Sequence, residues 1–237
     1  MAFDDDSLDI AFLLGKDIHL NGIGVLECKK INDLHDVGFE NYNKYLSCLC
    51  ITSDDIYELF EWNDEFQNID PYDFILANAL YNQEYFDNVV NGLSFFLQEE
   101  FKFNEGGFFE SVTKNSINKS NFNFFIDILR KQNCVNQESK KMTPKNEAQK
   151  KMFIKLKKAR AKYNKQDNNV IDIISSVCAK HPSISLFNVG ELSMYQLIDQ
   201  YKRLNAIDEY FISINSLMHG ASNDDIKVKH WSSKQRI

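Results

Sequence analysis

The stretch MYQLIDQYKRLNAIDEYFISINSLMHGA (residues 194–221) decides the fold class of this chain of 237 residues. Its apolar side chains recur at spacings of three and four, the period of a helix with one buried face. Gly220 follows them, in the position where glycine commonly ends a helix. We predict helices over 193–204 and 207–218 with core stripes of Tyr195, Leu197, Ile198, Tyr201 and Leu204, then Tyr210, Phe211, Ile214 and Leu217.

The opposite side of the first of these helices is polar. A ridge of amide and charged side chains is compatible with a protein-binding face, although a solvated helix face has the same composition. The ridge consists of Gln196, Asp199, Gln200, Lys202 and Arg203.

The part of the chain before residue 133 is rich in aromatic residues and predicts an α+β domain. Asn21-Gly22 predicts a β-hairpin within 16–31 with a type I′ turn, and a second hairpin within 101–112 has a four-residue loop from Asn104 to Gly107. Helix start signals stand at Asn32, Ser53, Asp70-Pro71 and Ser120. They predict helices over 32–50, from 53, over 71–82 and over 121–132, in that order. Apolar periodicity predicts a further helix over 83–100.

Residues 133–142 are polar and lack periodicity, so we predict a linker there. Thr143-Pro144 then restarts a helix with a thin apolar line through dense lysine, at Met152, Leu156, Ala159 and Tyr163. A further helix is predicted over 170–179, and residues 224–231 are read as a short strand or an extended tail. The fold class is therefore mainly α with small β-hairpins, and the division is an α+β domain (1–132), a linker (133–142) and a helical region (143–237).

The net charge of −7 is distributed unevenly. Residues 1–70 carry 16 acidic and 4 basic side chains, whereas residues 140–167 carry 11 basic and 2 acidic ones. Such a basic helix can contact phosphates, but it lacks the interleaved arginine and aromatic residues that contact bases. We expect it to face an acidic protein partner or the acidic first 70 residues, with nucleic-acid binding as the weaker alternative.

No motif of catalysis or metal binding is apparent. The histidines are scattered and none has the i, i+4 spacing of a metal pair, while the five cysteines form no C-x-x-C pair. Neither nucleotide-binding glycine motif is present. We expect no enzyme, no cofactor and no metal site. Asp4 to Asp6 and Asp9 lack the glycine and glutamate of a calcium loop, and we interpret the segment as a solvated tail.

The acidic start of the chain is unlike a signal peptide, and no apolar run approaches the length of a membrane span. We therefore expect a cytoplasmic protein without membrane contact.

Four short motifs occur in order after Asn188: Leu192-Ser193, Tyr195-Gln-Leu-Ile-Asp-Gln-Tyr-Lys-Arg203, Leu217-Met-His-Gly-Ala221 and Lys227-Val-Lys-His-Trp231. With these motifs the run from 188 to 231 resembles the C-terminal region of tail assembly chaperones of phages and prophages of low-G+C Gram-positive bacteria. It departs from them at Gly190, where an aromatic residue is expected, and at His219. The segments 18–46 and 143–162 also look like that group.

The resemblance implies a non-catalytic protein in the bacterial host cytoplasm that keeps the hydrophobic tape-measure protein soluble and recruits tail-tube protein, with self-association possible. The alternative is a structural virion protein of the tail or baseplate. We place the partner-binding face on Tyr195, Gln196, Asp199, Gln200 and Arg203 and on the tail residues Lys227, Lys229, His230 and Trp231.

Overall fold

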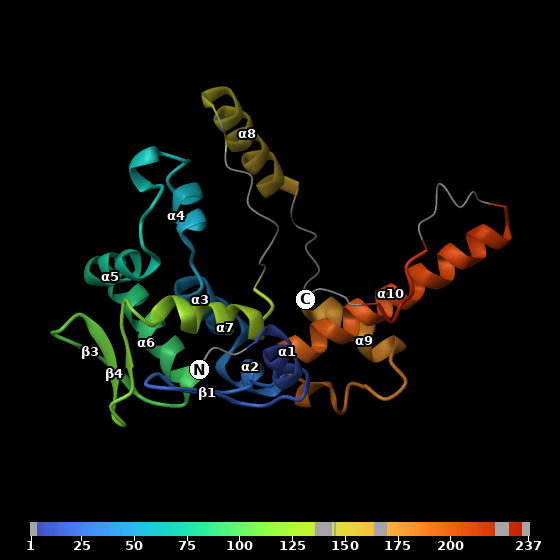
Figure 1. The fold of residues 1–237 in the computed structure, drawn as a ribbon, viewed down its shortest axis with the longest axis horizontal. Helices are drawn as coiled ribbons and strands as arrows, with labels where there is room; N and C mark the ends of the chain where they lie inside the picture. Colours follow the sequence, from blue (N-terminus) through green and yellow to red (C-terminus); the bar gives the residue numbers. More distant parts are fainter. Residues whose placement is uncertain (1–3, 136–143, 145, 164–169, 221–227, 234–237) are drawn as a thin grey trace.

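The computed structural model describes residues 4–135, 144, 146–163, 170–220 and 228–233 (Figure 1). It confirms a mainly α fold with small β-hairpins. The described α-helices are α1 (Asp5–Leu13), α2 (Ile31–Val37), α3 (Phe39–Leu49), α4 (Ser53–Leu59), α5 (Pro71–Tyr81), α6 (Gln83–Leu97), α7 (Phe122–Gln132), α8 (Glu147–Tyr163), α9 (Val170–Lys180) and α10 (Met194–Met218). Two 3-10 turns, η1 (Asp64–Phe66) and η2 (Val189–Glu191), complete the helical elements.

The centre of the fold is the packing of α3 against α6. Gly92 makes this close approach possible, because a Cβ atom there would lie 3.0 Å from Leu49 Cδ1 and 3.1 Å from Tyr45 Cβ. Leu49 and Leu93 are fully buried beside it. The helix predicted over 83–100 is thus confirmed as α6, although it ends at Leu97, where Gln98 takes a left-handed conformation.

Both predicted hairpins are present, but their turns differ from the prediction. In the first, β1 (Ile18–Leu20) pairs with β2 (Gly24–Leu26) across a three-residue loop in which Gly22 has φ of +74° and Asn21 has no positive φ, so the turn is not type I′. In the second, β3 (Phe101–Asn104) pairs with β4 (Phe108–Ser111), and Asn104 lies in the strand. A third strand that the sequence did not reveal, β5 (Ser116–Ile117), joins β4.

Several predicted helix starts were misplaced by a few residues. The run over 32–50 is two helices, because Gly38 between α2 and α3 has φ of +86°, and Lys30 rather than Asn32 precedes the first helix. Thr52, not Ser53, caps α4, and Asn121, not Ser120, precedes α7. The start at Asp70-Pro71 is confirmed, since Asp70 accepts hydrogen bonds from the first turn of α5.

The acidic start of the chain is not a solvated tail. Asp4 caps α1 by accepting a hydrogen bond of 2.8 Å from the backbone N–H of Ser7. Leu8 and Phe12 on the inner face of α1 are buried. On the outer face of α1, Asp9 forms a salt bridge with Lys131 of α7, with 2.9 Å between Asp9 Oδ1 and Lys131 Nζ. The acidic composition therefore concealed the helix α1 in the sequence. Its aspartates cap the helix and pair with Lys131, while its apolar residues pack in the core.

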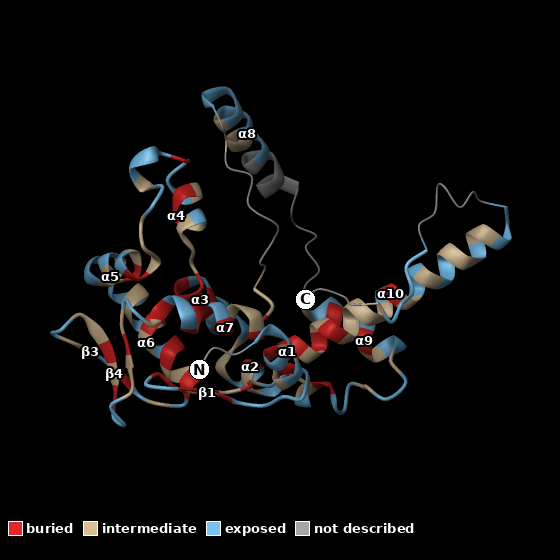
Figure 2. Ribbon diagram, viewed as in Figure 1, coloured by how far each residue is buried: buried red, intermediate tan, exposed pale blue. Residues whose placement is uncertain are grey.

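The two helices predicted over 193–204 and 207–218 are one continuous helix, α10. Figure 2 shows that its first half lies in the protein interior, whereas its second half extends away from the body and is exposed or half-buried. Residues 205–207 have no feature that breaks a helix, and Ala206 between them is buried. The predicted helix over 170–179 is confirmed as α9, which packs beside α10.

One hydrophobic core contains side chains from both sides of the predicted linker, including Phe12 and Leu26 from the first part and Met194 and Leu197 from the last. Asn133, at the start of that linker, is itself buried and accepts a hydrogen bond of 2.9 Å from the Tyr42 hydroxyl. Residues 136–142 lie outside the described residues. The division into 1–132, 133–142 and 143–237 stays a prediction, and the described contacts cross it.

Candidate partner-binding surface

The start of α10 is fixed by a capping box. Ser193 Oγ accepts a hydrogen bond of 3.2 Å from the backbone N–H of Gln196, and Gln196 Oε1 accepts one of 2.8 Å from the backbone N–H of Ser193. Just before it, the Leu192 carbonyl accepts a bond of 2.8 Å from the N–H of Ile31. These bonds fix the start of α10 beside the start of α2.

Ser193→Ala is expected to lower the free energy of unfolding by about 1 kcal/mol, because the N–H of Gln196 loses its acceptor at a buried helix end. Urea unfolding measures this loss. Ser216→Ala in the same helix is the matched control, since Ser216 is only half-buried and its hydroxyl donates to the Ile212 carbonyl. Equal losses in the two variants would contradict the capping role.

Tyr195 does not lie on the surface: its side chain is 2% exposed. Its hydroxyl donates a hydrogen bond of 2.8 Å to Asp9 Oδ1, and its ring centroid lies 5.4 Å from that of Phe12. Burial, and next the bond to Asp9, raise the pKa of Tyr195. Tyr195 therefore connects α10 to α1 in this structure.

Gln196 and Asp199 also make contacts within the chain. Gln196 Nε2 donates to the Leu13 carbonyl at 2.9 Å, at the end of α1. Asp199 is 6% exposed, and its Oδ1 lies 3.6 Å from Arg203 Nε. Gln200 Nε2 donates a hydrogen bond of 3.3 Å to Asp199 Oδ2. The first group of predicted site residues thus lies mostly between α10 and its neighbours, and its role in partner binding stays a prediction.

The tail residues 228–233 return to α10. Arg203 Nη1 donates a hydrogen bond of 3.2 Å to the Ser233 carbonyl, and the ring of His230 lies 5.1 Å from that of Tyr210. Trp231 is 42% exposed and its ring lies 5.4 Å from His230. The tail segment therefore contacts α10 at Arg203, a predicted site residue, and at Tyr210, which the prediction did not include. Lys229 is exposed, and Lys227 lies outside the described residues.

The unexpected glycine at 190 has a local cause. A Cβ atom on Gly190 would lie 2.0 Å from Asn32 Oδ1. Asn32 occupies this space while its Nδ2 donates to Glu191 Oε1 at 3.2 Å. An aromatic side chain at 190 would require Asn32 to move.

The second half of α10 was predicted to lie in the core, and this prediction is wrong. We call residues 207–218 the distal arm; none of them is buried. Phe211 is 57%, Ile212 64% and Met218 78% exposed. The adjacent pair Phe211-Ile212 was the sequence signal that this helix is more than a core stripe. Two neighbouring positions of a helix point about 100° apart, so the pair widens the apolar surface beyond one stripe.

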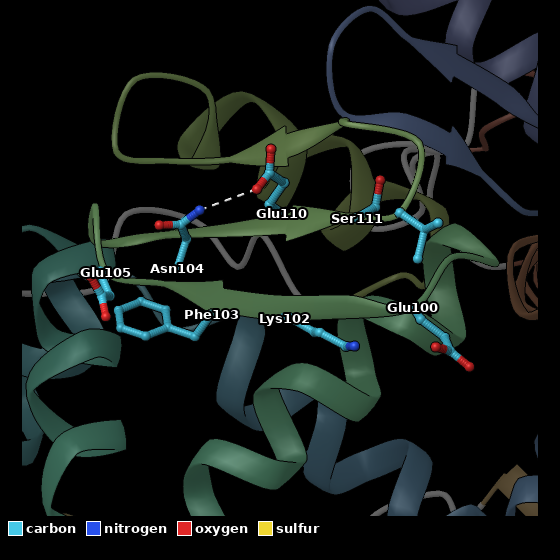
Figure 3. Close-up of a pocket in the computed structure, with 8 residues that line it drawn as sticks. Glu100, Lys102, Phe103, Asn104, Glu105, Glu110 and Ser111 are labelled. Atoms are coloured by element: carbon cyan, nitrogen blue, oxygen red, sulfur yellow. Dashed lines mark hydrogen bonds between the residues drawn. The ribbon is translucent and has the colours of Figure 1, made fainter.

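A separate hollow lies on the hairpin of β3 and β4 (Figure 3). Its lining includes the carboxylates Glu100, Glu105 and Glu110 and the amine of Lys102. Asn104 Nδ2 donates to Glu110 Oε2 at 3.1 Å, which joins the two strands. The lining residues do not place a nucleophile beside a base, so we do not assign chemistry to this hollow.

Three of the five cysteines are interior side chains, and Cys134 and Cys178 are half-buried. Cys28, Cys48 and Cys50 are buried, and burial raises the pKa values of Cys50 and Cys134 to about 12. Such thiols are protonated at neutral pH and are poor nucleophiles. Within the described part of the chain, no group of three histidine, cysteine or acidic side chains is arranged to hold a metal ion. Nor is any described helix both long and apolar enough to cross a membrane.

Comparison with known proteins finds a similarity in the C-terminal part of the chain. No curated protein and no solved structure matches the chain. A family model described as the YomV second domain matches residues 162–235, a range that contains α9, α10 and the tail. The C-terminal part of the chain is therefore similar to a phage-associated domain.

Proposed function

We propose that the protein is a non-catalytic tail assembly chaperone that binds tape-measure and tail-tube proteins during phage tail morphogenesis. The resemblance of residues 188–231 to such proteins supports the proposal, as does the phage-associated domain matched over 162–235. The matched domain does not name the partners, which are inferred from the resemblance alone.

The observation that carries the proposal is the exposed apolar surface of the distal arm. Ile207, Tyr210, Ile214 and Leu217 follow the alternating spacing of three and four that lets one helix pack along another. Phe211 and Ile212 widen this row on its sides. The row itself is half-buried, and the exposed apolar side chains beside it are of the kind that a chaperone can use to cover apolar helices of its client.

The test combines two measurements on infected or induced cells. Tagged full-length protein is pulled down during particle assembly, and purified virions are analysed by mass spectrometry. Recovery of tape-measure and tail-tube proteins, with absence from virions, is the expected result. Stoichiometric presence in virions would instead identify a structural protein of the tail or baseplate. Recovery of neither tail protein, together with absence from virions, would overturn both readings.

Trp231→Ala is expected to weaken capture of the tail proteins while leaving the fold intact. The indole is partly exposed beside the distal arm and is available to a bound helix. Loss of an aromatic anchor at an interface typically lowers affinity by about 2 kcal/mol, or about 30-fold. Quantitative pull-down measures capture, and thermal unfolding is the control. A large loss of thermal stability in this variant would contradict the prediction.

A further inference from the structure

The basic helix α8 contacts the rest of the described chain at an acidic surface. The ring of Phe153 lies 5.8 Å from that of Trp62, which is 8% exposed. Trp62 belongs to what we call the acidic lobe, residues 53–66, which comprises α4, η1 and the segment between them. In Figure 1, α4 and α8 lie on the same side of the molecule, away from the β-hairpins.

The charges of the two elements are opposite. The acidic lobe has six acidic residues and no basic one, and the sequence of α8 has seven basic residues and one acidic one. Opposite charge favours contact of α8 with the lobe, while contact between two α8 helices is opposed by repulsion of like charges. The prediction that the basic helix faces the acidic first part of the chain agrees with the contact between Phe153 and Trp62.

Each element also has apolar side chains that this internal contact leaves in solvent. On α8, Met152 is 57% and Leu156 41% exposed, and they line a shallow hollow on the helix surface together with Ala148, Lys151 and Lys155. On the acidic lobe, Leu59 is 59% and Phe60 37% exposed. These exposed pairs match in chemistry, because each is apolar at its centre and each is bordered by charges of the sign that the other lacks.

We propose that the protein forms a two-fold dimer in which the Met152–Leu156 face of α8 docks on the Leu59–Phe60 face of the acidic lobe of a second copy. A two-fold axis makes the contact twice, once for each α8, and closes the assembly without leaving a free end. Because the faces are small and bordered by exposed charges, the dimer is weak and sensitive to salt.

The experiment is sedimentation velocity of the full chain over a range of concentrations. At about 50 mM NaCl the charges interact over about 14 Å, and at about 500 mM over about 4 Å. We expect a concentration-dependent dimer whose dissociation constant rises by about tenfold or more at the higher salt. A wild-type protein that stays monomeric at low salt up to the highest soluble concentration would overturn the proposal.

Two charge-reversed proteins identify the surfaces. Lys151→Glu/Lys155→Glu on α8 and Glu61→Lys/Glu65→Lys on the lobe are each expected to be monomeric alone, because each meets a like charge on its partner. Mixed together they regain both attractive contacts, one between the two reversed surfaces and one between the two wild-type surfaces, and form a heterodimer. Lys16→Glu/Lys102→Glu has the same net charge as the α8 variant and alters exposed lysines elsewhere, so it keeps the dimer.

Met152→Ser/Leu156→Ser tests the apolar part without changing the charge. Both side chains are exposed, so circular dichroism is expected to be unchanged while dimerisation is lost. A dimer that survives all of the α8 variants would place the interface elsewhere and overturn the proposal. A monomer that binds duplex DNA, and loses that binding in Lys151→Glu/Lys155→Glu, would overturn it in favour of a nucleic-acid-binding helix.

Discussion

Phe12→Ala is expected to lower the free energy of unfolding by about 3–5 kcal/mol, the range for removing a buried aromatic ring from a core. Phe12 is fully buried on α1, and its ring contacts that of Tyr195 on α10. The cavity left by the ring would lie between the first and last helices of the core. Urea unfolding followed by circular dichroism measures the change.

Ile10→Ala is the matched control, because Ile10 lies on the same helix and is 57% exposed. We expect it to change the free energy of unfolding by less than about 0.5 kcal/mol, as surface substitutions usually do. If Phe12→Ala lost no more than this control, α1 would not be docked on α10 in solution. The interpretation of Tyr195 as a residue that joins the two helices would fail with it.

Phe211→Ser/Ile212→Ser in the distal arm is expected to reduce capture of the tail proteins by about 30-fold or more, because the loss of even one large apolar anchor at the centre of an interface costs about 2 kcal/mol. Both side chains are exposed in the free protein, so its thermal stability is expected to remain unchanged. Serine is also close to phenylalanine and isoleucine in helix propensity. Titration of purified protein against an isolated tape-measure fragment measures the effect.

Leu80→Ser/Val112→Ser removes a similar amount of exposed apolar surface from other elements, since these residues are 75% and 78% exposed. This control is expected to bind as the wild type does. Equal capture by the control and the distal-arm variant, with each matching the wild type, would show that the distal arm does not bind the client. The salt-sensitive dimer attributed to α8 involves neither pair, so its test is independent of this one.

Local signals predicted the elements whose structure depends on neighbouring residues. Asp70-Pro71 starts α5 because the aspartate side chain and the proline ring both act within the first turn. The spacing of apolar residues over 83–97 found α6, and glycine-containing turns found both hairpins. The predicted hairpin turns were wrong, since the pairing of Leu20 with Gly24 decides the length of the first loop and no local signal fixes that pairing.

Contacts between distant residues decided what the sequence did not show. The aspartates of α1 favoured a solvated segment, and only the positions of Lys131 and Tyr195 reveal why Asp9 belongs at the core edge. The stripe through Tyr210, Phe211 and Ile214 had core periodicity, yet α10 extends beyond the elements that could cover it. Periodicity identifies an apolar helix face, but which molecule covers that face depends on the fold.

The bond between Asp9 and Tyr195 joins residues 186 positions apart and has a consequence for synthesis on the ribosome. At about 5–20 residues per second, α1 waits roughly 10–40 seconds after it is made before its binding site on α10 exists. During that time Phe12 lacks its partner, and the core cannot close until α10 has been made. A truncated product that ends before α10 would expose this surface permanently and would be open to proteolysis.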